Sequence, residues 1–236
     1  LVVGGAGGIG GGIAEAFLAA GATVVIADFN EEFTNRRARE IGSLGVAIDV
    51  TNETSVRYAV ATATKLMGRI DILVNSAGIA TQSPVVDMSL EVWNETLAVD
   101  LSGVFLVTHH VLPQMLQRGD GRIINVASQL GIKGAASLAH YAAAKAGVIA
   151  FTKSLALEVS ANGVLVNAIA PGVIETPMTE FTRNTPEKLE KFMLRTPMSR
   201  IAQAEELIGP VVFLASDMSS YVTGITLAVD GGFLAA

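Results

Sequence analysis

The amino-acid sequence predicts an α/β fold, in which a mostly parallel sheet of about seven strands is covered by helices on both faces as a doubly wound, three-layer domain. Two observations predict it. Short apolar runs alternate with helix-length amphipathic segments over the whole chain, a pattern typical of right-handed crossovers between parallel strands. The runs at 24–27, 72–75 and 122–126 are continuous rather than alternating, as expected for strands that are buried on both faces.

In chain order, each expected strand is a short apolar run, and a helical pattern follows it. The first strand, Leu1–Val3, precedes a glycine-rich turn and a helix at 9–20, whose apolar face consists of Ile13, Ala14, Phe17 and Leu18. The later strands are Thr23–Ala27, Val46–Ile48, Ile72–Val74, Arg122–Val126, Val164–Ile169 and Thr226–Val229. The later helical patterns lie at 31–42, 53–67, 89–117, 138–160 and 203–215.

No repeat, linker or charge block interrupts this alternation, so we expect one domain over residues 1–236. The irregular stretch from Pro171 to Arg200 is interpreted as a lid or substrate loop, covering about 171–200. The chain starts without Met on a short first strand, so we expect further residues upstream of Leu1.

The composition excludes several classes of protein. Half of the residues are hydrophobic and 16% are charged, which is typical of a folded globular chain and not of a disordered one. No apolar run reaches the roughly 18 to 20 residues that span a bilayer, and a signal peptide is not recognisable, so we expect a cytoplasmic protein without a membrane partner. The absence of cysteine excludes disulfides and thiolate metal sites. The net charge of −6 is unclustered, which argues against nucleic acid as a partner.

A run of glycines joins the first strand to the first helix, at positions 4, 5, 7, 8, 10, 11 and 12. A glycine-rich turn before a helix can bind the pyrophosphate of a dinucleotide, because the helix N-terminus offers free N–H groups and the positive end of its dipole. Gly5, Gly7 and Gly10 fit G-x-G-x-x-G, whereas Gly4, Gly8 and Gly10 fit G-x-x-x-G-x-G. The spacing alone leaves both registers open.

Asp28 ends the second expected strand, about twenty residues after the glycine loop, where an acidic side chain accepts hydrogen bonds from the adenosine ribose. The same carboxylate repels a 2′-phosphate, and Gly11 offers no basic side chain for one, so we expect NAD in preference to NADP. The alternative is that Asp28 caps a helix, since Asn30 and Glu31 follow it.

Tyr141 and Lys145 are four residues apart on an expected helix and therefore share one face. A nearby ammonium stabilises a phenolate, and such a tyrosine can exchange a proton with an alcohol or ketone oxygen. Ser128 ends the preceding strand, and its hydroxyl can orient the same oxygen. Each feature by itself is also explained by surface packing or helix capping, but their combination with the glycine loop indicates an enzyme.

Together these residues resemble the classical short-chain dehydrogenase/reductase family, and the resemblance extends over essentially the whole chain. The family's T-G-x-x-x-G-x-G motif matches the register with Gly4, Gly8 and Gly10, and it includes Ile9 in the cofactor-binding loop. The resemblance implies a Rossmann-like fold and places further cofactor contacts at Asp49 and Val50 (adenine), at Asn75, Ala77 and Gly78 (beside the central sheet), and at Pro171, Gly172, Ile174 and Thr176 (nicotinamide).

The reaction that the resemblance implies is hydride transfer between a nicotinamide and a carbinol or carbonyl carbon. Tyr141 would be the general acid and base, Ser128 would hold the substrate oxygen, and Lys145 would bind the nicotinamide ribose next to Tyr141. Ser128, Tyr141 and Lys145 occupy the family's catalytic positions, and Asp100 occupies the fourth, which is usually asparagine.

The chain departs from the family pattern at Val3, where a threonine is usual, at Ser76, in place of the second asparagine, and at Asp100. A carboxylate can accept but not donate a hydrogen bond, and it carries charge. Near Lys145 it would stabilise the ammonium and partly cancel its effect on Tyr141. We expect proton transfer by the catalytic residues to survive with an altered pH dependence. The alternative is that Asp100 only caps or bends a helix.

Other conspicuous residues are interpreted more simply. His109, His110 and His140 lack the spacing of metal ligands, so no metal is expected, and surface or interface positions are predicted for all three. Trp93 is expected to serve packing. The apolar residues of the lid either serve packing or line a substrate pocket, namely Met178, Phe181, Phe192 and Met193.

The sequence therefore favours an NAD-dependent oxidoreductase acting on a secondary alcohol or ketone, such as a sugar or polyol. A 3-oxoacyl-thioester reductase of the same family is the alternative enzyme, although Asp28 and the net charge disfavour NADPH and an acidic acyl carrier. A dinucleotide-binding sensor without catalytic activity is the alternative of another class. The helices expected at 89–117 and 138–160 resemble those through which family members form homodimers and homotetramers, so we expect such an assembly.

Overall fold

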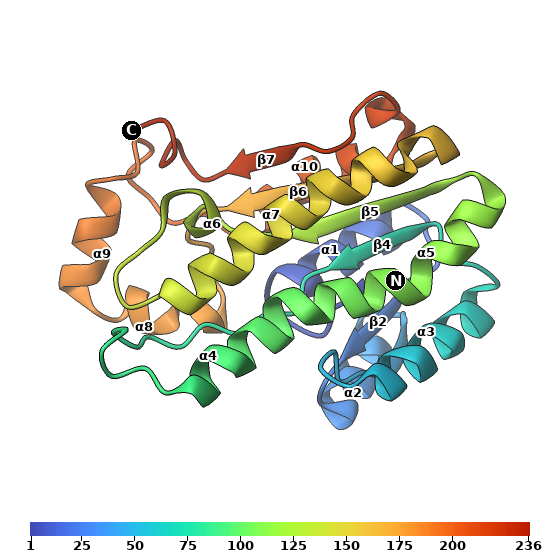
Figure 1. The fold of residues 1–236 in the computed structure, drawn as a ribbon, viewed down its shortest axis with the longest axis horizontal. Helices are drawn as coiled ribbons and strands as arrows, with labels where there is room; N and C mark the ends of the chain where they lie inside the picture. The colour runs from blue at the N-terminus through green and yellow to red at the C-terminus, as the bar shows by residue number, and fades with distance from the viewer.

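The computed structural model describes residues 1–236, except for the side chains of Phe181 and Lys191. All seven strands run parallel in one sheet, in the order β3-β2-β1-β4-β5-β6-β7 (Figure 1). The strands are β1 (Val2–Val3), β2 (Val25–Asp28), β3 (Leu44–Ala47), β4 (Ile72–Asn75), β5 (Gly121–Val126), β6 (Val164–Pro171) and β7 (Thr226–Val229). The predicted α/β fold with a parallel sheet of seven strands is confirmed.

Helices cover both faces of this sheet, and their buried side chains show which helix packs on which face. One face carries α3 (Glu53–Met67), α5 (Gly103–Arg118) and α7 (Ala139–Val159), and the other carries α1 (Gly8–Ala19), α2 (Glu31–Ile41) and α10 (Ile208–Ala215). In Figure 1, α5 and α7 cross in front of the strands. The central strands β1, β2, β4, β5 and β6 are thus buried on both faces, which explains why they are continuously apolar, whereas the outer strands β3 and β7 are partly exposed.

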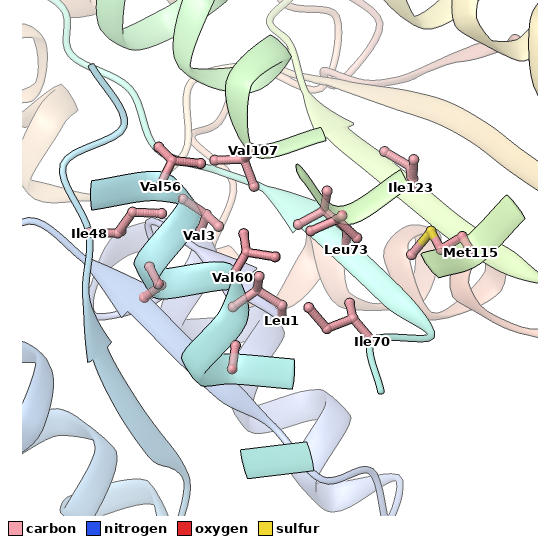
Figure 2. Close-up of a cluster of buried hydrophobic side chains, with 14 of the residues drawn as sticks. Leu1, Val3, Ile48, Val56, Val60, Ile70, Leu73, Val107, Met115 and Ile123 are labelled. Atoms are coloured by element: carbon pink, nitrogen blue, oxygen red, sulfur yellow. The ribbon is translucent and has the colours of Figure 1, made fainter. Parts of the chain in front are cut away.

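The larger hydrophobic cluster lies between the sheet and α3, α5 and α7 (Figure 2). Leu73 of β4 and Ile123 of β5 are fully buried there, in contact with the helix layer that includes Val107 and Met115 of α5. Burial of such side chains stabilises the fold by roughly 1.5 to 3 kcal/mol each. This packing supports β4, which pairs with β1, and β5, which pairs with β4.

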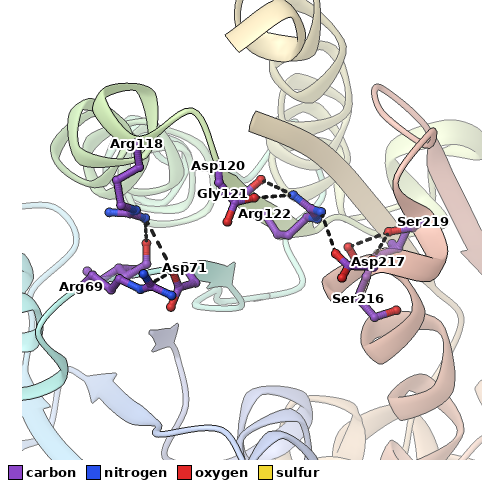
Figure 3. Close-up of polar contacts among 11 residues, drawn as sticks. Arg69, Asp71, Arg118, Asp120, Gly121, Arg122, Ser216, Asp217 and Ser219 are labelled. Atoms are coloured by element: carbon purple, nitrogen blue, oxygen red, sulfur yellow. Dashed lines mark hydrogen bonds and ion pairs between the residues drawn. The ribbon is translucent and has the colours of Figure 1, made fainter. Parts of the chain in front are cut away.

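Polar contacts gather at the edge where β4 and β5 begin (Figure 3). Asp71, directly before β4, pairs with Arg69 at 2.9 Å, and Arg118 donates a hydrogen bond to the carbonyl of Ile70 at 2.7 Å. Arg122 of β5 pairs with Asp120 at 3.1 Å and with Asp217 at 3.4 Å. These pairs lie at the amino ends of the strands. Ligands of open α/β sheets bind at the opposite side, beyond the carboxyl ends of the strands.

The helix expected at 89–117 is interrupted. It consists of α4 (Leu90–Leu97), a π-helical turn at Ala98–Ser102 and α5, and π-helical turns are rare outside functional sites. Within Leu90–Arg118 an 18-residue window has a mean hydropathy of 1.2, so by length and composition alone this helical run could span a bilayer, and the expectation that no segment could do so is wrong. In this fold its apolar side chains, such as those of Val107 and Val111, belong to the core.

The stretch predicted to be irregular, 171–200, contains short helices that the sequence did not predict. These are a 3-10 turn at Pro177–Thr179, α8 (Glu180–Arg183) and α9 (Pro186–Met193). A further short helix, α6 (Leu130–Lys133), follows β5, and the helix expected at 203–215 begins as a 3-10 turn, Ala204–Leu207, before α10. In Figure 1, α8 and α9 lie at the end of the sheet to which the strand arrows point.

The central strand supplies a direct test of the core. Leu73→Ala removes a fully buried side chain, and we expect it to lower the free energy of unfolding by about 2 to 5 kcal/mol because a cavity remains. Urea denaturation measures the change. Leu194→Ala, at a side chain that is 80% exposed, is the control and should change stability by no more than about 0.5 kcal/mol. Equal losses in both variants would contradict the assigned core.

Candidate active site

The candidate site is a cavity of about 760 Å³ at the carboxyl edge of the sheet. The strand order reverses between β1 and β4, so the segments that follow these two strands diverge and leave a crevice between them. Segments after all strands from β1 to β6 line the cavity. The predicted functional segments therefore meet at this one cavity, although their residues are far apart in the sequence.

The glycine loop forms one wall of this cavity. Glycine is required at each of its three key positions for a different structural reason. Gly4 has a φ of +74°, and a Cβ there would lie 2.4 Å from the backbone nitrogen of Ala77. Gly8, at the start of α1, has a φ of +53°. Gly10 packs so closely on the loop that a Cβ would lie 2.1 Å from the carbonyl oxygen of Gly4. The register with Gly4, Gly8 and Gly10 thus has a structural basis.

The start of α1 is suited to an anion. Its N-cap is Gly7, which has no side chain to satisfy the first N–H groups, and its first turn contains no acidic residue. The positive end of the helix dipole is therefore directed at the cavity, which Gly7, Gly8 and Ile9 line. The glycine loop and the start of α1 together form a cradle that fits a pyrophosphate group.

Asp28 lies at the cavity end of β2, and the alternative that it caps α2 is wrong. The N-cap is Asn30, whose side chain accepts a hydrogen bond from Phe33 N at 2.9 Å. The carboxylate of Asp28 instead accepts from Ala6 N at 3.1 Å and from Phe29 N at 2.8 Å. Asp28 is thus held against the glycine loop, with further acceptor capacity on both oxygens.

Asp49 and Val50 line the cavity beyond β3, and Asp49 accepts hydrogen bonds from the backbone and hydroxyl of Thr51 at 2.9 and 2.6 Å. Asn75 behaves differently. Its side chain is buried and donates to Asn125 at 2.9 Å and to Thr108 at 3.1 Å. Asn75 therefore connects β4 to β5 and α5 from behind the cavity rather than lining it.

Ser128 and Tyr141 both line the cavity, Ser128 from the segment after β5 and Tyr141 from the first turn of α7. Lys145 follows one turn later and is almost completely buried. Its Nζ donates to the carbonyl of Val126 at 3.1 Å and lies 5.6 Å from the centre of the Tyr141 ring. The helical spacing predicted from the sequence thus places the ammonium beside the phenol.

Asp100 lies behind this group, in the π-helical turn, and is fully buried. Its Oδ2 is 3.2 Å from Lys145 Nζ, and its Oδ1 accepts from Ile79 N at 2.8 Å. A Cβ on Gly78 would lie 3.0 Å from Asp100 Oδ2 and 3.3 Å from Lys145 Nζ, so Gly78 leaves room for the pair. The carboxylate predicted to stabilise Lys145 does form this ion pair.

The two groups affect each other's ionisation. Burial raises the pKa of Asp100 above its ordinary value, against the opposing charge of Lys145 and the hydrogen bond from Ile79. Burial by itself would lower the pKa of Lys145, but the charges of Asp100 and Tyr141 raise it above its ordinary value. Each group thus offsets part of the cost of burying the other.

Similar proteins were found over the full length of the chain. The family described as enoyl-(acyl carrier protein) reductase matches residues 4–234. The 3-oxoacyl-(acyl-carrier-protein) reductase of Thermotoga maritima is 41% identical over 99% of this chain and 96% of its own length. The chain belongs to the classical short-chain dehydrogenase/reductase family. Members of this family of oxidoreductases bind NAD or NADP, and the resemblance seen in the sequence is confirmed.

Solved structures of this family superpose closely. A putative gluconate dehydrogenase from Agrobacterium tumefaciens has a TM-score of 0.96 at 32% identity, covering 100% of this chain and 95% of its own. A putative NAD(P)-dependent gluconate 5-dehydrogenase from Beutenbergia cavernae, with bound NADP, has a TM-score of 0.91 at 38% identity, covering 100% and 96%. These two relatives show the Rossmann-like fold and are both named for gluconate, whereas the curated relative is named for a 3-oxoacyl substrate.

Most of the residues predicted for the short-chain dehydrogenase/reductase site line the cavity, and the exceptions support it from behind. Those that line it are Gly4, Gly8, Ile9, Asp28, Asp49, Val50, Ala77, Gly78, Ser128, Tyr141, Lys145, Pro171, Gly172, Ile174 and Thr176. Gly10, Asn75 and Asp100 do not. Phe29, Phe33 and Glu95 also line the cavity and were not predicted; the only signal for Phe29 and Phe33 is two aromatic side chains directly after a candidate ribose-binding acid.

The histidine prediction is wrong for His140, which is completely buried, whereas His109 is exposed and His110 is half-buried. Among the described residues, no group of acidic and histidine side chains could hold a metal ion. Of the apolar lid residues, Met178 lines the cavity, whereas Phe192 stacks on Phe233. The side chain of Phe181 lies outside the described residues.

The role of the glycine loop in cofactor binding is tested by two glycine substitutions in the same helix, α1. We expect Gly10→Ala to weaken NADH binding at least about tenfold and to lower stability, because its Cβ would collide with the carbonyl of Gly4. Calorimetric titration with NADH and thermal unfolding measure both effects. Gly12→Ala is the control, since its Cβ would make an ordinary contact at 3.6 Å with Ala204 and alanine favours a helix. Unchanged NADH affinity in Gly10→Ala would contradict the cradle.

Proposed function

We propose that this protein is an NAD-dependent oxidoreductase that interconverts a secondary alcohol and a ketone, with a sugar, polyol or similar compound as substrate. The observation that carries the proposal is the placement of Ser128 and Tyr141 on one cavity wall, with the ammonium of Lys145 beside the phenol. A protein that only bound a dinucleotide would not need this arrangement.

The chemistry follows from the positions of these groups. In alcohol oxidation, Tyr141 as phenolate accepts the hydroxyl proton, and Ser128 donates a hydrogen bond to the same oxygen. Lys145 stabilises the phenolate and is itself fixed by Val126 and Asp100. The nicotinamide, when bound, accepts the hydride in this direction and supplies it in the reverse direction. Ketone reduction uses the same groups with Tyr141 as the acid.

The cofactor would lie along the carboxyl edge of the sheet. Under this proposal the start of α1 binds the pyrophosphate, Asp28 the adenosine ribose, and Asp49 and Val50 the adenine, while Tyr141 and Lys145 hold the nicotinamide ribose. The segment with Asn75, Ala77 and Gly78 supports the centre, and the segment from Pro171 to Thr176 the nicotinamide. The fit of these groups is supported by the open cradle at Gly4, Gly8 and Gly10.

The preference for NAD over NADP is part of the proposal. Among the described side chains that line the cavity, Lys145 is the only cation, and it is engaged by Asp100 far from Asp28 in the fold. A 2′-phosphate at the adenosine ribose would therefore meet the carboxylate of Asp28, while the guanidinium of Arg36, 5.0 Å from the ring centre of Phe33, does not line the cavity.

A 3-oxoacyl-thioester reductase is the second candidate, favoured by the names of the curated relatives. An acidic acyl carrier would require basic side chains around the cavity entrance. In the lid, Arg183 is paired with Glu175 at 2.8 Å and Arg200 with Glu206 at 2.6 Å. These engaged cations and Asp28 favour a small sugar or polyol substrate with NAD over an acyl carrier with NADPH.

Assembly into a homodimer or homotetramer is proposed through the outer faces of α5 and α7. Phe105 of α5 is half exposed, and its ring meets that of Phe151 of α7 edge to face at 6.3 Å. Leu157 of α7 is 86% exposed on the same layer. Burial of these side chains by a second copy would remove apolar surface from water. The cytoplasmic location stays a prediction.

The function is tested by turnover. Purified protein is given a panel of polyols, sugar acids, cyclic diols, hydroxysteroids and 3-oxoacyl thioesters with NAD(H) or NADP(H), and absorbance at 340 nm is followed. We expect turnover of a polyol, a sugar acid or a similar small alcohol or ketone, and Tyr141→Phe should reduce kcat by about 10² to 10⁴-fold with NADH binding retained. NADH binding without turnover of any compound would support a sensor, and preference for the thioester would support the second candidate.

Asp28 tests the cofactor preference. Asp28→Ser removes the charge that opposes a 2′-phosphate, and we expect the ratio of kcat/KM for NADP to that for NAD to rise by about tenfold or more. Glu31→Gln is the matched control, because it removes one negative charge from an exposed position of α2 that does not line the cavity. An equal change in both variants would indicate a general charge effect and contradict the assigned role of Asp28.

A further inference from the structure

Two exposed aromatic side chains, Phe29 and Phe33, line the cavity next to Asp28. Phe29 is 75% exposed and Phe33 is 39% exposed. Aromatic rings of this size are largely buried in most folded proteins, because each carries a large apolar area. Exposed apolar area in a concave site is typical of a surface that contacts a ligand. Neither ring takes part in the proposed reaction, so a different role is indicated.

The backbone fixes Phe29 beside the carboxylate of Asp28 and beside the end of β3. Phe29 is the first residue after β2, and its N–H donates a hydrogen bond to Asp28 Oδ1 at 2.8 Å. The carbonyl of Asp28 accepts from Ile48 N at 2.9 Å, so the chain that leaves β2 runs alongside the chain that leaves β3. Phe29 therefore lies on the side of Asp28 where Asp49 and Val50 also line the cavity.

Phe33 lies on the other side of Asp28, toward the glycine loop. It is in the first turn of α2, and a Cβ on Gly7 would lie 3.8 Å from its Cε1, an ordinary contact distance. The guanidinium of Arg36 lies 5.0 Å from the centre of the Phe33 ring, close enough for a cation–π contact. The ring of Phe33 is thus engaged by Arg36 and lies close to the cradle for the pyrophosphate, whereas Phe29 borders the cavity farther from that cradle.

The chemistry of a dinucleotide decides which of the two rings meets the base. The adenosine ribose carries the pyrophosphate on C5′ and the adenine on C1′, so these two groups leave the ribose in different directions. With the pyrophosphate at the start of α1 and the ribose at Asp28, the adenine extends away from the glycine loop. It then enters the part of the cavity that Phe29 borders.

We propose that Phe29 is a cofactor-binding residue whose ring stacks on the adenine, while Phe33 bounds the adenosine ribose on the side of the glycine loop. Stacking of a base on an aromatic side chain is favourable because two flat apolar faces leave water together. It holds the adenosine half of the cofactor without reading the hydrogen-bonding edge of the base. This inference rests on the proposed binding mode of the cofactor and not on the proposed reaction or substrate.

The stack is tested first by calorimetric titration of Phe29→Ala with NADH. We expect the affinity to fall by about five- to a hundredfold, the range typical for loss of one base–aromatic stack. Thermal unfolding should stay unchanged, because the side chain is exposed. Tyr58→Ala is the matched control, since this aromatic side chain of α3 is 71% exposed and does not line the cavity. Wild-type affinity in Phe29→Ala, or an equal loss in Tyr58→Ala, would overturn the proposal.

Stacking is separated from recognition of the base edge by the reduced dinucleotide in which hypoxanthine replaces adenine. Hypoxanthine has an oxygen in place of the 6-amino group but keeps the two flat faces. We expect Phe29→Ala to weaken the binding of both dinucleotides by the same factor, within about twofold, and Phe29→Tyr to retain the affinity for both, since its ring has the same face. A loss confined to NADH, or a loss in Phe29→Tyr as large as in Phe29→Ala, would contradict stacking.

The placement of the base is tested by comparing the two rings. We expect Phe33→Ala to weaken NADH binding less than Phe29→Ala does, because Phe33 lies on the side of the pyrophosphate. A larger loss in Phe33→Ala would place the adenine on the other side of Asp28 and overturn the assignment. These measurements need no substrate, so a sensor without turnover would still show the effect of Phe29. Turnover of a polyol by Phe29→Ala with wild-type NADH affinity would instead support the proposed function and overturn the stack.

Discussion

The parallel direction of all seven strands is the constraint on which the rest of the structure depends. Parallel strands need crossover helices, and these cover both faces of the sheet. Only the two ends of the strands therefore remain accessible. The amino-terminal edge is occupied by ion pairs such as Arg69–Asp71 and Arg122–Asp120. The reaction site therefore lies at the carboxyl ends of the strands, where the chain leaves each strand.

Close backbone contacts then set the shape of that edge. Gly4 lies against Ala77 and Gly10 against Gly4 at distances that leave no room for a Cβ, and a Cβ on Gly78 would fit only tightly against the Asp100–Lys145 pair. These contacts join the segments after β1 and β4 to the helix layer behind them. The glycines therefore do more than admit a pyrophosphate, since they also place the buried charges within reach of Tyr141.

Elements with a strong local pattern could be predicted from the sequence. The strands are continuous apolar runs, and the spacing of Tyr141 and Lys145 already places them on one helix face. The π-helical turn at Ala98–Ser102 could not be predicted, because the apolar periodicity continues through it and the break depends on packing against α7. The burial of His140 was missed for the same reason. Deciding between Asp28 and Asn30 as helix cap required hydrogen-bond geometry, because both residue types favour that position.

The carboxylate at position 100 changes the electrostatics of the site in a specific way. A buried ammonium next to a neutral amide would present its full charge to Tyr141, whereas next to Asp100 most of that charge is compensated. The ion pair lowers the cost of burying Lys145 and at the same time weakens its effect on the phenol.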